Sequence, residues 1–332
     1  MLVEIKQGVI LAHINSPKFN LLDKLKSFAV DNRHHFLFED NGELESWLSG
    51  DSVHGNLYKQ SLNNNSRAAS RLPHTQKRII VTSGEECTWG ATIATLTLTE
   101  TIRVLETPLY VMLENAANDW HFLLKTLDQA SRARLTYHQD KRWLVPIHGG
   151  GSQITDRIIE YSQKPSDKFR IFCIYDSDRR HPDELAPNWL PTGAEGCQGY
   201  KTQQSAEEHI PDSHHMLSRR FIESYIPRRE LERCIGSNQN VSQDKIDAYF
   251  RLSNNGRWFY NMKKGFAGDN TRENAGREKT LYQGISAADT TLLNTGFGNS
   301  IADIYSQEGD FDWDVEAREE FSQITPRIMN YL

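Results

Sequence analysis

Three carboxylates in the middle of the chain stand where a β-sheet would bring them together. Glu114 directly follows the apolar run PLYVML, and Asp176 and Asp178 follow the apolar run FRIFCIY in the same way. In an open parallel sheet, ligands bind beyond the carboxyl ends of the strands. If the two runs are neighbouring strands, the three side chains converge there, and we expect them to form a metal-binding acidic site.

The residue types favour Mg²⁺ or Mn²⁺ as the cofactor. Three crowded carboxylates raise one another's pKa unless a cation lies among them. Hard oxygen ligands suit these ions, which keep several waters and bind substrate phosphates. Alternate residues leaving a strand point to one side, so Asp176 and Asp178 could share a metal while Ser177 turns away. The alternative is that Asp178 caps a helix and the other two carboxylates are merely exposed.

The elements that must position these acids alternate between strands and helices over residues 101–235. We expect strands at 108–113, 143–147, 169–175 and 214–217, with helices at 119–130 and 152–162 and a Gly-rich turn at 149–151. This order predicts an α/β domain, a parallel sheet flanked by helices. Residues 1–100 are expected to form an α/β extension of unclear role, and residues 236–332 a mostly helical region.

Two polar segments outside the predicted sheet have open interpretations. Residues 61–78 are rich in Asn and Ser and contain basic but no acidic residues, which is typical of a solvated linker or of a mobile basic arm. Residues 307–321 are acidic and amphipathic. They predict a solvated helix or a docking face for a partner.

The pattern of strand, Glu, Gly-rich turn, strand and DxD resembles the TOPRIM domain of topoisomerases, primases and OLD-family nucleases. The run RRFIESYIP at 219–227 resembles the element that follows the DxD motif in OLD-like proteins of prokaryotic anti-phage defence. The resemblance covers about residues 105–270. It implies a metal-dependent nuclease that hydrolyses phosphodiester bonds of DNA or RNA.

The resemblance also assigns roles to individual residues. It implies that Glu114 is the general base or a metal ligand, that Asp176 and Asp178 are metal ligands, and that Glu223 is an additional acid. A catalytic lysine would be Lys263 or Lys264. The alternatives are a surface Glu223 paired with an arginine, and two solvated lysines.

Two positions differ from the family pattern and keep other functions open. Asn115 stands where the family has Gly, and Asp119 lies five residues after Glu114 instead of four. A non-catalytic subunit that keeps the TOPRIM shape for assembly is therefore an alternative. A DxD phosphatase with Asp176 as nucleophile is another, although Arg180 occupies the position where that family has Thr or Val.

Charge and composition limit the partners. The net charge of −6 does not indicate a nucleic-acid binder, so phosphate contacts would have to come from local arginines. The candidates lie beside the acidic motifs: Arg179, Arg180, Arg219, Arg220, Arg228 and Arg229. No Walker A motif is present, which predicts a separate ATPase subunit of the ABC or SMC type, and a homo-oligomer is possible.

The remaining features predict a cytoplasmic protein. No apolar run reaches the roughly 18 residues that a membrane span needs, and the first residues do not resemble a signal peptide. The four cysteines lack zinc-ligand spacing, and Cys173 is expected to be a buried apolar residue.

Overall fold

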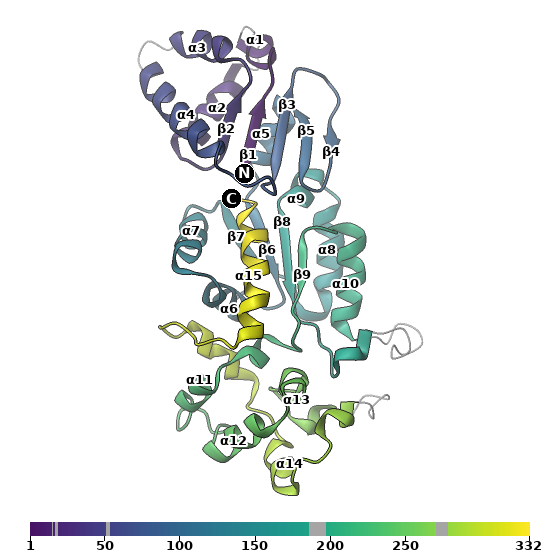
Figure 1. Cartoon of the computed structure of the whole chain (residues 1–332). Helices are drawn as coiled ribbons and strands as arrows, with labels where there is room; N and C mark the ends of the chain where they lie inside the picture. Colours follow the sequence, from purple (N-terminus) through teal and green to yellow (C-terminus); the bar gives the residue numbers. More distant parts are fainter. Residues whose placement is uncertain (15, 17–18, 51–53, 186–196, 270–277) are drawn as a thin grey trace.

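The computed structural model describes residues 1–14, 16, 19–50, 54–185, 197–269 and 278–332. Two β-sheets with flanking helices follow one another along the molecule, and a helical segment lies beyond the second sheet (Figure 1). The last helix returns across the second sheet and brings the carboxyl terminus next to the amino terminus (Figure 1). Among the helices in the described ranges, none has the length and apolar character needed to cross a membrane.

The first sheet is mixed, with strand order β2-β1-β3-β5-β4 and only β4 antiparallel to its neighbour. Its strands are β1 (Leu2–Ile5), β2 (His35–Phe38), β3 (Arg78–Thr82), β4 (Thr88–Trp89) and β5 (Ile93–Thr97). Its helices are α1 (Val9–Ile14), α2 (Phe19–Val30), α3 (Asn41–Ser49), α4 (Gly55–Ala69) and α5 (Leu98–Glu106). The expected α/β character of the first hundred residues is confirmed.

Helix α4 corrects the prediction that residues 61–78 form a solvated linker or a mobile arm. The polar residues of this segment have partners in β2 and in the residue before it: Asn65 is buried, and its side-chain amide donates to the carbonyl of His34 at 2.8 Å. The Ser66 hydroxyl donates to the carbonyl of Phe36 at 2.9 Å. Composition indicated a loop because Asn and Ser are poor helix formers, but here they satisfy the backbone of an adjacent strand.

The second sheet is wholly parallel, as predicted, with strand order β7-β6-β8-β9. Its strands are β6 (Leu109–Leu113), β7 (Leu144–His148), β8 (Ile171–Tyr175) and β9 (His214–Met216). Its helices are α6 (Asn118–Thr126), α7 (Gln129–Asp140), α8 (Ile154–Ser162), α9 (Pro165–Phe169) and α10 (Gln198–His209). The single helix expected at 119–130 ends at Thr126, because Asp128 caps a second helix by accepting from the backbone N–H of Ser131.

Side-chain alternation along β6 and β8 builds a core on each face of this sheet. Val111, Leu113, Phe172 and Ile174 join the larger cluster with α6 and α15, and Met112, Ile171, Cys173 and Tyr175 join a smaller cluster with α8 and α10. Both strands are therefore apolar throughout, as expected for a covered parallel sheet. The predicted burial of Cys173 is confirmed.

The carboxyl-terminal third is helical, as predicted. Its helices and 3-10 turns are η3 (Ile222–Tyr225), α11 (Arg228–Arg233), α12 (Gln243–Arg251), α13 (Asn254–Phe259), η4 (Phe266–Asp269), η5 (Glu278–Tyr282), α14 (Ala287–Leu293), η6 (Asn299–Ser306) and α15 (Val315–Met329). Between β9 and α12 the chain forms a loop, η3 and the short α11, which begins after Pro227.

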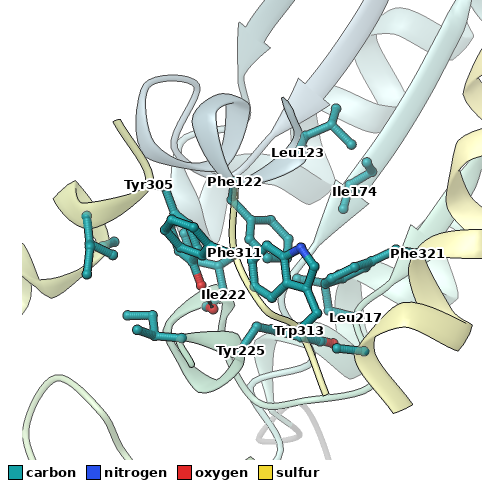
Figure 2. Close-up of a cluster of buried hydrophobic side chains, with 14 of the residues drawn as sticks. Phe122, Leu123, Ile174, Leu217, Ile222, Tyr225, Tyr305, Phe311, Trp313 and Phe321 are labelled. Atoms are coloured by element: carbon teal, nitrogen blue, oxygen red, sulfur yellow. Dashed lines mark hydrogen bonds between the residues drawn. The ribbon is translucent and has the colours of Figure 1, made fainter. Parts of the chain in front are cut away.

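The acidic segment 307–321 is not a solvated helix or a free docking face. Phe311 and Trp313 are buried in an aromatic cluster with Phe122, Tyr305 and Phe321 (Figure 2). Acidic residues alternate with these rings and stay on the surface. The exposed acidic residues of this segment were predicted correctly. The sequence could not show that the rings of Phe311 and Trp313 pack beneath the carboxyl ends of β6 and β8.

Candidate acidic metal site

Glu114 and the DxD segment meet at the carboxyl edge of the second sheet. Strands β6 and β8 are adjacent and parallel, with Leu113 opposite Ile174, so the residues that follow them leave the sheet side by side. The backbone N–H of Asp176 donates to Oε1 of Glu114 at 3.1 Å. Glu114 and Asp176 are therefore adjacent, and the charge of Asp178 acts on Glu114. Metal binding by the three carboxyls stays a prediction.

The DxD segment has a different backbone from the one expected. Strand β8 ends at Tyr175, and Asp178 has a left-handed conformation with φ of 54°, which Asp tolerates better than most residues. Its N–H donates to the carbonyl of Arg220 at 3.0 Å. Ser177 is fully buried and donates to the carbonyl of Arg219 at 2.9 Å. Ser177 turns inward as predicted, but strand alternation does not orient Asp178.

Helix α10 holds this loop in place through a close backbone approach. A Cβ atom added at Gly199 would lie only 2.1 Å from the carbonyl oxygen of Ser177, so no other residue fits there without moving the loop. The glycines after β7 act differently. Gly150 and Gly151 have φ of 80° and 58°, which makes the tight turn into α8 that the sequence predicted.

Asp119 is a further member of the cluster that the site prediction did not include. An Asx turn at Asn115, whose side chain accepts from the N–H of Ala117 at 3.1 Å, leads into the first turn of α6. Oδ2 of Asp119 accepts from the N–H of Asn115 at 2.9 Å. The carboxyl is thereby held near Glu114, and its charge acts on Asp176. The sequence indicated Asp119 only through its position five residues after Glu114, where the TOPRIM pattern has an Asp four residues after the Glu.

Glu223 and Lys263 complete the cluster. Glu223 is 2% exposed, which excludes a surface residue paired with a neighbouring arginine, and its Oε1 lies 3.2 Å from Nζ of Lys263. Its Oε2 is buried and accepts no hydrogen bond from any described residue. Lys264 is exposed. Of the two candidate lysines, only Lys263 reaches the acids.

The carboxyls strongly perturb one another. Burial, then the charges of Asp178 and Asp119, raise the pKa of Glu114 to about 8. Burial raises the pKa of Asp119 to about 7, with Glu223 adding to the shift. Burial, then Glu114 and Asp119, raise the pKa of Asp176 well above its ordinary value. Burial opposes the charge of Lys263, but Glu223 and Asp176 outweigh it and raise the pKa of this lysine.

The carboxylate oxygens of the cluster are suitable ligands for a hard divalent cation. They do not lie close enough together to coordinate one. Every acid offers oxygen ligands, and the unpaired Oε2 of Glu223 is a buried acceptor in need of a positive charge. Across the described ranges, however, no three His, Cys, Asp or Glu side chains are arranged closely enough to hold a metal ion. Ion binding would have to draw the carboxyls of the cluster together.

The raised pKa values predict a pH-dependent stability. The pKa of Glu114 rises from 4.5 to about 8 and that of Asp119 from 3.8 to about 7, so between these values the folded chain binds more protons than the unfolded chain. The contribution of these two carboxyls to the free energy of unfolding therefore falls as pH rises through this window. Burial lowers the pKa of His34, His35 and His138 below 6.5, so these histidines contribute in the opposite direction at the acidic end of the window. In the presence of a chelator, we expect the Tm of the wild-type protein to fall by several degrees more between about pH 5 and about pH 8 than the Tm of the double variant Glu114→Gln, Asp119→Asn.

Two controls make this Tm measurement specific. Mg²⁺ or Mn²⁺ should reduce the fall, because a cation compensates the charge that deprotonation creates. The double variant Glu114→Gln, Asp119→Asn should also have a smaller fall in chelator. An equal change of Tm with pH in the wild-type protein and the double variant would contradict the proposed crowding.

Three of the six arginines expected to contact phosphate are buried supports of the loops. The side chains of Arg180, Arg219 and Arg220 are each 3–4% exposed, and each pairs with a carboxylate. Their respective partners are Glu184, Asp314 and Asp269. A nucleic acid cannot reach these guanidinium groups without displacing their carboxylates, because buried ion pairs are costly to break.

Arg179 is half-buried and bonds two backbone carbonyls, those of Pro182 at 3.1 Å and Ser218 at 2.7 Å. The sequence placed these arginines correctly beside the acidic loops. It could not show that their charge is already neutralised or engaged. Most of the segment 181–200 that follows them lies outside the described residues.

Comparison of the chain with protein-family models, with curated proteins and with solved structures finds no match. The site therefore has to be interpreted from its own geometry.

Proposed function

We propose that the protein is a metal-dependent nuclease of the TOPRIM class, which hydrolyses phosphodiester bonds of DNA or RNA with Mg²⁺ or Mn²⁺. The observation that carries the proposal is the convergence of Glu114, Asp119 and Asp176 with the buried Glu223 and Lys263 at the carboxyl edge of a parallel sheet. A cluster with this much unbalanced negative charge is typical of a site that binds a cation and a phosphate.

Glu114, Asp176 and Asp178 would hold the cation, with Asp119 or Glu223 as further ligands. The ion would neutralise charge at the scissile phosphate and make a bound water more acidic. Glu114 would accept the proton of the attacking water. Its pKa of about 8 leaves it mostly protonated at neutral pH, so nearby positive charge must first lower that pKa. Lys263, which stays charged, would stabilise negative charge on the phosphate or the leaving oxygen.

The test is cleavage by the purified protein of supercoiled plasmid and of tRNA, with Mg²⁺, with Mn²⁺ and with chelator. Metal-dependent cutting of either substrate supports the proposal. Because the chain lacks a Walker A motif, the assay should be repeated with the product of the neighbouring gene. We propose an ABC- or SMC-type ATPase as that partner and anti-phage defence as the setting, both by analogy with OLD-like proteins.

A second candidate is a non-catalytic assembly subunit with the same shape. The absence of an assembled metal-ligand group among the described residues favours it. Titration calorimetry with Mg²⁺ and Mn²⁺ separates the two, because only the nuclease proposal requires binding at the carboxylate cluster. Binding that disappears in Glu114→Gln and Asp176→Asn would favour the nuclease.

The phosphatase alternative has weaker support. A nucleophilic Asp176 would need both oxygens available, but its Oδ1 accepts from the N–H of Ile222 at 3.0 Å. Arg180, at the position where that family has Thr or Val, is buried against Glu184. Trapping of an aspartyl-phosphate analogue on Asp176 would favour the phosphatase.

A further inference from the structure

A groove of about 390 Å³ is lined in part by Ser224 and Tyr225 of η3, the turn that also contains Glu223 of the acidic cluster. It is bounded by the segment from Arg219 to Arg228, by α12 and α13, and by the start of α15. Its volume falls within the range of sites that hold a small organic group. The groove lies outside the carboxylate cluster described above.

The floor of the groove contains a polar group without a protein partner. Ser224 is 3% exposed, and its hydroxyl makes no hydrogen bond to any described residue. A buried hydroxyl of this kind costs free energy unless something completes its hydrogen bonding. Since Ser224 lines the groove, a ligand in the groove is in the position to do so.

The groove and the acidic cluster share one short element. Glu223, which contacts Lys263 in the cluster, and Ser224, which lines the groove, are consecutive residues of η3, and their Cα atoms are therefore about 3.8 Å apart. The N–H of Ile222 on the same turn bonds Asp176. The acidic cluster and the groove therefore both contact the same turn.

The walls offer flat surfaces and hydrogen-bonding groups. The guanidinium of Arg219, which is buried and paired with Asp314, lies 4.6 Å from the ring centre of Tyr225 and 5.0 Å from that of Trp258 and supports these rings rather than a ligand. The guanidinium groups of Arg257 and Arg228 lie 5.2 Å and 5.4 Å from the ring centre of Phe250. Aromatic rings and guanidinium planes are the surfaces on which proteins stack unpaired bases.

The rim distinguishes a base from a phosphate as the occupant. Asp312, Asp314 and Glu316 all line the groove, and their charge would repel a phosphate group. The ring and amino N–H groups of a nucleobase, in contrast, donate to carboxylates. The arginines of the groove can in turn donate to base carbonyls and ring nitrogens.

From these observations we infer that the groove binds one unstacked nucleobase of a single-stranded nucleic acid whose backbone passes the acidic cluster. The inference rests on the proposed nuclease function and specifies its substrate: a single-stranded segment or loop, cut with a preference for the base next to the scissile phosphate.

The test is binding of fluorescent single-stranded homopolymers of each base, in RNA and DNA form, to the Glu114→Gln protein, followed by anisotropy with Mg²⁺. One homopolymer should bind at least about tenfold more tightly than another. Arg257→Ala on this background should weaken the preferred homopolymer about 5-fold to 150-fold, the range that stacking of a base gives. Arg257→Lys should not restore binding, because it keeps the charge but loses the plane.

Two further variants separate a ligand contact from a folding effect. Ser224→Ala should change the order of base preference while leaving Tm unchanged, because the hydroxyl has no protein partner to lose. Arg157→Ala removes an exposed arginine of α8 that pairs with Glu160, and should change neither measurement.

The outcomes distinguish the two proposals. Cleavage by the wild-type protein without base preference, with Arg257→Ala and Ser224→Ala behaving like Arg157→Ala, would overturn the base-binding groove and leave the nuclease standing. Failure of every homopolymer to bind, together with no cleavage of plasmid or tRNA, would overturn both.

Discussion

Glu114→Gln and Asp176→Asn are each expected to lower the rate of nucleic-acid cleavage by about a thousandfold or more. Each substitution keeps the size of the side chain and removes a carboxyl that can ionise, and bind a cation, at the place where the two strands end. A carboxylate that moves a proton or holds the reacting phosphate in place contributes about 10²–10⁴ in rate. The measurement is single-turnover cleavage of the substrate that the wild-type protein cuts best.

The same variants should become more stable in the absence of a divalent cation. Asp176 is buried beside Glu114 and Asp119, so removing its charge relieves repulsion, and the amide oxygen of Asn can still accept from the N–H of Ile222. A higher Tm with lost cleavage identifies a site where function is maintained at a cost in stability. Glu160→Gln, at an exposed carboxylate of α8, is the matched control and should affect neither property. Cleavage that persists unchanged in both site variants would remove these residues from the mechanism.

Lys263→Met is expected to have the second largest effect, on stability as well as on activity. The ammonium group is the cation paired with Glu223, whose side chain is 2% exposed. Removing one partner of a buried pair leaves an uncompensated charge and costs about 3–5 kcal/mol. We expect a loss of about 3 kcal/mol in the free energy of unfolding, at the lower end of this range, because a third of the Lys263 side chain is exposed to solvent. Urea unfolding measures this loss, and cleavage should fall by about 10²-fold or more.

The neighbouring lysine and a double variant provide the controls. Lys264→Met removes the same charge one residue further along, at an exposed position, and should leave the free energy of unfolding within about 0.5 kcal/mol of wild type. Lys263→Met combined with Glu223→Gln should recover much of the lost stability but none of the activity. Equal effects of the two single lysine variants would show that Lys263 has no special role.

Much of the fold around the site could be predicted from local patterns. The runs 109–113 and 171–175 are continuously apolar because both faces of the second sheet are covered, and such runs identify buried parallel strands without knowledge of their neighbours. The order of strands and helices then restricts the topology to right-handed crossovers. That is why the adjacency of Glu114 and Asp176 could be expected before the structure was described.

Predictions about individual polar residues depended on contacts that local patterns do not contain. Asn65 and Ser66 looked like loop residues because their partners lie in β2 and in the residue before it, some thirty residues earlier. The arginines beside the acidic loops looked available for phosphate because their carboxylate partners, Asp269 and Asp314, are distant in sequence. Polar side chains form hydrogen bonds only over about 3 Å, so the role of each one depends on which partner the tertiary structure places at that distance.

The sequence by itself therefore determined the parallel α/β sheet, the helical carboxyl-terminal region and the strand-end positions of Glu114, Asp176 and Asp178, because periodicity and strand order are properties of the chain. Only the tertiary structure decided that Asp119 belongs to the cluster, that Lys263 and not Lys264 faces it, and that the acidic segment 307–321 buries its rings beneath the site. Each of these depends on the angle at which a turn leaves its strand or helix, and packing against distant residues sets that angle.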